Sequence, residues 1–159
     1  MDIFATIQAS DAQWKAVQEA VDELKKHEVL VGIPQEKSSR KGKGKVTNAE
    51  LLFIHTNGSP ARGIPPRPVL QPAIENDKDR VGEMLGKAID AATSGNKMQV
   101  VPALERAGMY GANVCRAWFT NQNNKFAPNK PETVKRKGSL RPLIDTGEMQ
   151  KSITYVVRK

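Results

Sequence analysis

The sequence predicts an α+β fold, with a mostly antiparallel sheet packed against two long helices and several shorter ones. Apolar residues recur at helical spacing over two long segments, 70–95 and 98–119. Short apolar or alternating segments at 29–33 and 153–157 indicate strands that are far apart in the chain. Separated strands and intervening helices are typical of an α+β architecture. A length of 159 residues predicts a single domain, 1–159.

The N-terminal third predicts a strand, a helix and a second strand. Apolar and polar residues alternate over 3–8, which suggests a short strand. Ser10 and Gln13 have the spacing of a capping box and predict a helix over 11–27. Its apolar stripe consists of Trp14, Val17, Val21 and Leu24. The apolar run 29–33 then ends before a proline, which favours a buried strand.

The middle of the chain combines a short helix with two segments that cannot form a core. Residues 35–45 contain no apolar side chain and predict a long mobile loop. Thr47 and Glu50 repeat the capping-box spacing and predict a helix over 48–56, which Asn57-Gly58 can end in a left-handed cap. Five prolines between 60 and 72 then predict a stiff, extended connector.

The C-terminal half contains the two long helices. The apolar side of the first consists of Leu70, Ile74, Val81, Leu85, Ala88 and Ala92. The apolar side of the second consists of Val101, Leu104, Ala112, Cys115 and Phe119. Residues 121–142 are polar, basic and interrupted by prolines, so we expect them, like 35–46, to form an extended or mobile arm.

The net charge points to an anionic partner. Twenty-five Lys and Arg against 17 Asp and Glu give +8. The candidate contacts to DNA or to an acidic protein surface are Lys37, Arg40, Lys41, Lys43, Lys45, Lys135, Arg136 and Lys137. They are not interleaved with aromatic residues, which suits phosphate contacts and not base stacking. Solvated loops without a partner remain the alternative interpretation.

Several function classes lack support in the sequence. One cysteine excludes an intramolecular disulfide, and we expect Cys115 in the core. The two histidines, His27 at a helix end and a packed, hydrogen-bonded His55, have no ligand cluster beside them, so no metal and no cofactor is expected. No phosphate-binding loop or nucleophile elbow is present. Residues 1–10 lack the features of a signal peptide, and no apolar run could span a bilayer, so we expect a soluble protein without membrane contact.

Asp145-Thr146-Gly147 after two apolar residues resembles the loop of aspartic proteases. Only 12 residues follow Gly147, too few for the flap and strands of such an enzyme. The alternative is a helix cap, in which Asp145 accepts backbone N–H bonds and Glu148 lies near the positive end of a short helix. We favour the cap and expect no enzymatic activity.

Four ordered motifs resemble one protein family. They are Val31-Gly32-Ile33-Pro34, then Asn48-Ala49-Glu50-Leu51 running into Ile54-His55-Thr56-Asn57-Gly58, then Ile64-Pro65-Pro66-Arg67-Pro68-Val69-Leu70, and last Pro142-Leu143-Ile144-Asp145-Thr146-Gly147-Glu148-Met149 with Ser152-Ile153. This set resembles the virion morphogenesis proteins of tailed bacteriophages, which complete the tail or neck at the head–tail junction.

The resemblance implies a non-enzymatic structural subunit of the virion that joins a ring, expected to be a hexamer, around the DNA path. The implied partners are other copies of the chain, tail-tube or tail-terminator proteins, head connector proteins and packaged DNA. The implied location is the tail or neck of the virion, after assembly in the host cytoplasm. The residues that we expect at subunit interfaces are Ile64, Pro65, Arg67, Pro68, Leu143 and Asp145. A non-specific nucleic-acid-binding protein acting outside the particle is the alternative.

Overall fold

The computed structural model describes residues 11–40 and 46–159, and this part of the chain has the predicted α+β fold. Its helices are α1 (Asp11–Leu24), α2 (Asn48–Asn57), α3 (Leu70–Asn76), α4 (Lys78–Thr93), α5 (Lys97–Trp118), α6 (Pro131–Lys137) and α7 (Glu148–Ser152). Its strands are β1 (Glu28–Gly32) and β2 (Thr154–Arg158). Short 3-10 turns occupy Gln35–Lys37, Pro60–Arg62 and Gln122–Asn124. The predicted strand at 3–8 and the Ser10 cap lie outside the described residues.

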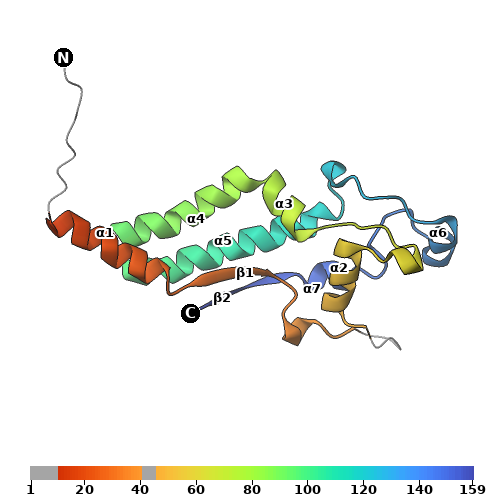
Figure 1. Ribbon diagram of the computed structural model, residues 1–159, viewed down its shortest axis with the longest axis horizontal. Coiled ribbons are helices and arrows are strands. Elements are labelled where there is room, and N and C mark those ends of the chain that lie inside the picture. Colours follow the sequence, from red (N-terminus) through yellow and green to blue (C-terminus); the bar gives the residue numbers. More distant parts are fainter. Residues whose placement is uncertain (1–10, 41–45) are drawn as a thin grey trace, which may run out of the picture.

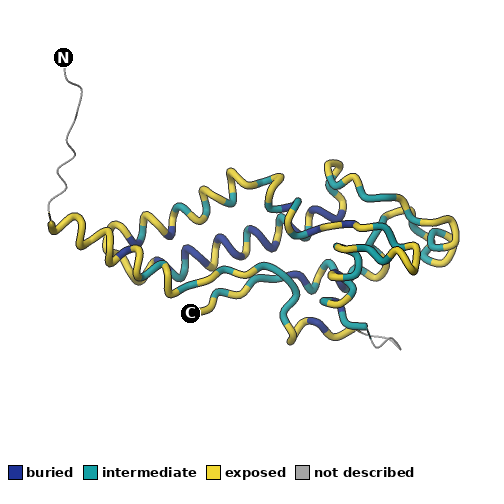
Figure 2. The backbone as a smooth tube through the Cα atoms, in the orientation of Figure 1, coloured by how far each residue is buried: buried dark blue, intermediate teal, exposed yellow. Residues whose placement is uncertain are grey.

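The molecule is elongated and has two ends of different construction (Figure 1). The helical end consists of α1, α4, most of α5 and the β1–β2 sheet. The loop end consists of α2, α6, α7 and the irregular segments between them. Helix α5 runs from one end toward the other and is the most continuously buried element in the fold (Figure 2).

The sheet is an antiparallel pair that covers one side of α5. Its register runs from Glu28 opposite Arg158 to Gly32 opposite Thr154. The approach to α5 is close, since a Cβ added at Gly108 would lie 2.5 Å from Cδ2 of Tyr155. The prediction that the strand at 29–33 is buried was wrong, because β1 has no buried residue and Leu30 is 44% exposed. A sheet of two strands against one helix has only one covered face.

The helical end packs through small side chains. Its buried cluster consists of Ala20, Ala88, Ala92, Val100, Ala103 and Leu104. Alanines let helices α1, α4 and α5 approach closely. Several larger apolar side chains of these helices lie on the protein surface. Of the predicted stripe of α1, Leu24 packs against this cluster, whereas Trp14 is 60%, Val17 46% and Val21 41% exposed. Leu85, expected in the core, is also 37% exposed.

The first predicted long helix is two helices, α3 and α4, separated at Asp77. Asp77 has φ −123° and ψ 26°, outside the helical region. Its carboxylate accepts a hydrogen bond of 2.5 Å from the hydroxyl of Tyr110 on α5. The second predicted long helix, 98–119, is confirmed as α5 within one residue at each end.

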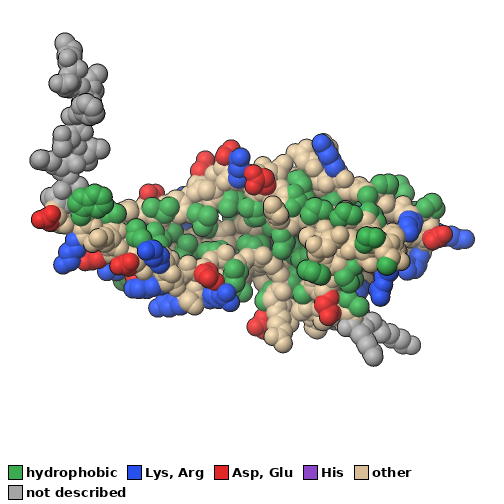
Figure 3. All heavy atoms as spheres, viewed as in Figure 1, with side chains coloured by type: hydrophobic (Ala, Val, Ile, Leu, Met, Phe, Trp, Pro, Cys, Tyr) green, Lys and Arg blue, Asp and Glu red, His purple; other side chains and the backbone are tan. Residues whose placement is uncertain are grey.

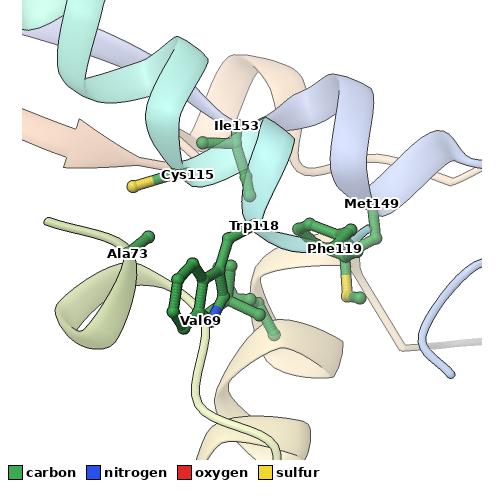
Figure 4. Packing of buried hydrophobic residues seen from close by; sticks show 8 residues of the cluster. Val69, Ala73, Cys115, Trp118, Phe119, Met149 and Ile153 are labelled. Carbon is green, nitrogen blue, oxygen red and sulfur yellow. The ribbon is translucent and has the colours of Figure 1, made fainter. Parts of the chain in front are cut away.

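The core of the loop end is built from large side chains (Figure 4). Its buried members are Leu52, Val69, Ala73, Cys115, Trp118, Phe119, Met149 and Ile153. Cys115 is fully buried as predicted, and burial raises the pKa of its thiol to about 11. This core joins the end of α5 to α2, α3 and α7, and so fixes the elements that surround the candidate site.

Helix α2 begins as predicted. The Thr47 hydroxyl accepts from the backbone N–H of Glu50, and the Glu50 carboxylate accepts from the backbone N–H of Thr47 at 2.7 Å. After α2, Gly58 has φ 73° but ψ 179°, so it is not a left-handed helical cap. A Cβ at Gly58 would lie 2.8 Å from the carbonyl oxygen of Ile64, which explains the glycine at this turn.

The described residues of the two predicted arms include regular structure, a 3-10 turn at Gln35–Lys37 and helix α6. In the first, the Ser38 carbonyl accepts from the backbone N–H of Asn48 at 2.7 Å, which holds the described part of 35–46 against α2. The second, 121–142, contains α6 and is not extended throughout. None of the described helices combines the length and apolar character needed to cross a membrane.

Candidate functional site

The charge of the protein is distributed unequally between its two ends. The segments that contain α1, α3, α4, α5 and the two strands, residues 11–32, 70–118 and 154–159, carry eleven basic and eleven acidic side chains. The described residues of the loop end carry eleven basic but only five acidic side chains. Figure 3 shows basic side chains around the α6 end, whereas both signs alternate along α1. Among residues 11–40 and 46–159, the excess of positive charge predicted to mark a partner surface is therefore carried by the loop end.

A cavity of about 490 Å³ lies in this basic end. Its walls come from α2, the Pro-rich connector, α6 and the segment before α7. Its basic lining residues are Arg40, Arg62, Arg67, Lys130, Arg136 and Lys137, and its acidic ones are Asp145 and Glu148. Leu51, Ile64, Pro65, Leu143 and Met149 add apolar surface. The cavity thus combines a cationic excess with an apolar wall.

Arg67 is the most deeply buried cation of the cavity, with 6% of its surface exposed. Its Nε donates to the carbonyl of Ala127 at 2.8 Å, and its Nη2 donates to the carbonyl of Pro128 at 2.9 Å. Among the described residues, no carboxylate forms an ion pair with it. Burial accordingly lowers the pKa of this guanidinium. These hydrogen bonds link the Pro-rich connector, residues 60–72, to the segment before α6. They do not neutralise the positive charge of Arg67.

Neighbouring groups experience this uncompensated charge. The pKa of His55 is lowered, first by burial and then by the charges of Arg67 and Lys137. The pKa of Lys137 is also lowered by burial, and Arg67 and Arg136 lower it further against the opposing effect of Asp145. Cations that destabilise one another in a partly desolvated space favour the entry of an anion.

Two buried polar atoms of the cavity walls have no hydrogen-bond partner among the described residues. They are Oδ1 of Asn48 and Nδ1 of His55. The Asn48 side chain is 1% exposed, and its Nδ2 donates to the Ser39 carbonyl and the Ser152 hydroxyl. His55 is half-buried as predicted, but its Nδ1 is not hydrogen-bonded. Unpaired buried polar atoms are uncommon and mark positions where a ligand group can bind.

The segment before α7 corrects the prediction for Asp145. Asp145 is exposed and does not cap α7. The backbone N–H of Glu148 instead donates to the Thr146 hydroxyl at 3.4 Å, and Gly147, with φ 78°, makes the turn into the helix. Glu148 does begin the helix, as predicted. The side chain of Asp145 is thereby free to line the cavity opposite Lys137.

The cavity brings together residues from both predicted site groups. The expected interface residues Ile64, Pro65, Arg67, Leu143 and Asp145 line it, and Pro68 does not. Arg40, Arg136 and Lys137 of the basic group line it, whereas the exposed Lys37 and Lys135 lie outside. Lys41, Lys43 and Lys45 are not among the described residues.

Sequence reasoning did not assign Asn48, His55, Arg62 or Lys130 to the site. Asn48 and His55 belong to the second of the four sequence motifs, and this membership was the only sign in the sequence that they could contribute to a site. Arg62 lies in the Pro-rich connector and Lys130 directly precedes Pro131, and neither belongs to a periodic apolar pattern. Within the described residues, no group of three or more His, Cys, Asp or Glu could hold a metal ion.

The chain matches no protein-family model, no curated protein and no solved structure. Three of the four motifs described in the sequence come together in the structure. Residues of 48–58, 64–70 and 142–149, which are far apart in sequence, all line the same cavity. The first motif, 31–34, lies outside it, at the end of β1.

Proposed function

We propose that this chain is a structural subunit of a tailed-bacteriophage virion that completes the tail or neck and joins the tail to the head. The ordered motif set supports the proposal, and its main structural support is that three of the motifs surround one basic cavity. An elongated subunit with one neutral and one basic end suits a position between unlike neighbours.

Deletion of the coding sequence from the phage genome tests this role. We expect DNA-filled heads with unattached or malformed tails in electron micrographs, and restoration of joined particles when the chain is supplied from a plasmid. Particles with normal morphology and infectivity in the deletion strain would contradict the proposal.

Ring formation is the second part of the proposal. The subunit forms a ring, expected to be a hexamer, alone or on tail-tube, tail-terminator or head connector proteins. Mass photometry of the purified chain, with and without these proteins, measures the assembly directly. A chain that stays monomeric in every mixture would contradict ring formation.

The basic end favours one alternative function, a non-specific nucleic-acid-binding protein that acts outside the particle. It predicts monomer binding to DNA that weakens steeply with salt, because Lys and Arg release counterions from phosphates. Replacing Arg40, Lys41, Lys43 and Lys45 by Ala should then abolish binding in an electrophoretic shift assay. No binding at low salt would exclude this alternative.

A further inference from the structure

We infer that the basic cavity binds a short peptide segment of a partner protein that carries both carboxylates and apolar side chains. The identification of that partner as a virion protein rests on the proposed function. The binding chemistry rests on the cavity itself, and three properties of its walls support it.

The first property is charge. Arg40, Arg62, Lys130 and Arg136 line the cavity without an ion-pair partner among the described residues, as does the buried Arg67. Arginine forms short, charge-assisted and often bidentate hydrogen bonds to carboxylates. An entering carboxylate would therefore offset the repulsion between these cations and would gain strong hydrogen bonds.

The second property is the unpaired acceptor. Oδ1 of Asn48 is buried and has no donor among the residues that the structure describes, while the Nδ2 of the same amide is already satisfied by two acceptors. A ligand that brings an N–H or O–H group as well as negative charge could satisfy this acceptor together with the cations. A peptide has backbone N–H groups beside its carboxylates, whereas the phosphodiester backbone of DNA has acceptors only.

The third property is the size and apolar wall of the cavity. A volume of about 490 Å³ suits a small molecule or a few residues of a peptide. The apolar groups of Leu51, Ile64, Pro65, Leu143 and Met149 would be covered by apolar side chains of a peptide. The combination favours an acidic, partly apolar peptide over nucleic acid.

The test is an NMR titration of the full chain with defined probes at low salt. The probes are blocked hexapeptides of alternating leucine and glutamate, the same peptide with glutamine for glutamate, hexathymidylate, and inorganic pyrophosphate. We expect the glutamate peptide to bind with a Kd of about 1 mM or tighter. The Asn48 side-chain amide and the His55 ring should shift, and the glutamine peptide should bind at least about tenfold more weakly.

Two double variants separate the cavity from general attraction to a basic surface. Arg62→Gln with Arg136→Gln removes two cavity charges and should weaken glutamate-peptide binding by about tenfold. Lys37→Gln with Lys135→Gln removes two exposed charges from the same end, outside the cavity, and should change binding by less than about twofold. Both doubles have the same net charge, so unspecific attraction would fall equally.

Several outcomes would overturn the inference. They are equal loss in the two double variants, no shift of Asn48 or His55 at 10-fold the expected Kd, and tighter binding of hexathymidylate at these two residues. Pyrophosphate that binds as tightly as the glutamate peptide would reduce the site to one for small anions. Normal virions in the deletion strain, with peptide binding intact, would remove the virion role and leave the cavity chemistry standing.

Discussion

The helical end and the loop end reach stability by different means. The helical end buries small side chains, mainly alanines, between closely spaced helices, and its basic and acidic residues balance. The loop end buries large side chains, such as Trp118 and Phe119, and holds an excess of positive charge around a cavity. The difference suggests that the helical end is a scaffold and that the loop end is where a partner binds.

The largest expected difference between the two ends comes from truncating a large buried side chain in the core of the loop end. Trp118→Ala should cost about 3–5 kcal/mol of unfolding free energy, because it removes a large buried side chain and leaves a cavity. Urea denaturation measures this cost. Phe53→Ala is the matched control on the same end, since Phe53 is 70% exposed and its loss should be nearly neutral. Equal costs would show that the core of this end is misplaced.

At the helical end, position on the helix decides the effect of the same substitution. Leu104→Ala should cost about 2–5 kcal/mol, because Leu104 is 7% exposed within the alanine-rich cluster. Leu85→Ala should cost less than about 1 kcal/mol, because Leu85 is 37% exposed. The two variants are compared by thermal unfolding, and a reversed order would contradict the packing of α4 on α5.

Close helix packing at the same end should also resist enlargement. Ala88→Leu should destabilise by about 1–3 kcal/mol, because Ala88 is 1% exposed and has no space for three more carbons. Lys87→Leu, one residue earlier on the exposed side of α4, is the control and should be tolerated. Urea midpoints of the pair provide the measurement, and a tolerated Ala88→Leu would mean that α1, α4 and α5 are loosely packed.

The charge of the loop end should appear as a pH dependence. Burial and the nearby Arg67 and Lys137 lower the pKa of His55 in the folded chain, so the unfolded chain takes up the proton first. Stability should therefore be full above the ordinary histidine pKa of about 6.5 and should fall as the pH decreases from there toward 5. His55→Gln should flatten this decline in thermal unfolding, and an equally steep decline in the variant would assign it to other groups.

Local sequence patterns predicted the elements well where their residues interact with close neighbours. The Thr47–Glu50 cap and the length of α5 are local features, and both were confirmed. The interruption at Asp77 was missed because the apolar periodicity continues through it, while the contact with Tyr110 comes from 33 residues away. The stripe of α1 was recognised, but periodicity alone does not tell whether another element covers it.

Many residues of the candidate site could be predicted from the sequence, but the cavity that they form together could not. Fourteen residues were predicted for contacts or interfaces, and eight of them line the cavity. The role of Arg67 was not visible, because its partners are the backbone carbonyls of Ala127 and Pro128, which any residue would provide. The depth of Asn48 and its unpaired oxygen likewise arise only when segments far apart in the chain meet.

The contact between Arg67 and the chain sixty residues later also affects the timing of biosynthesis. The walls of the cavity are contributed by residues from Arg40 to Met149, so a growing chain on the ribosome cannot form it until almost all of these residues have emerged. Contacts of high sequence separation form late because they must close long loops. A partner that recognises the cavity would therefore bind finished subunits and ignore nascent ones.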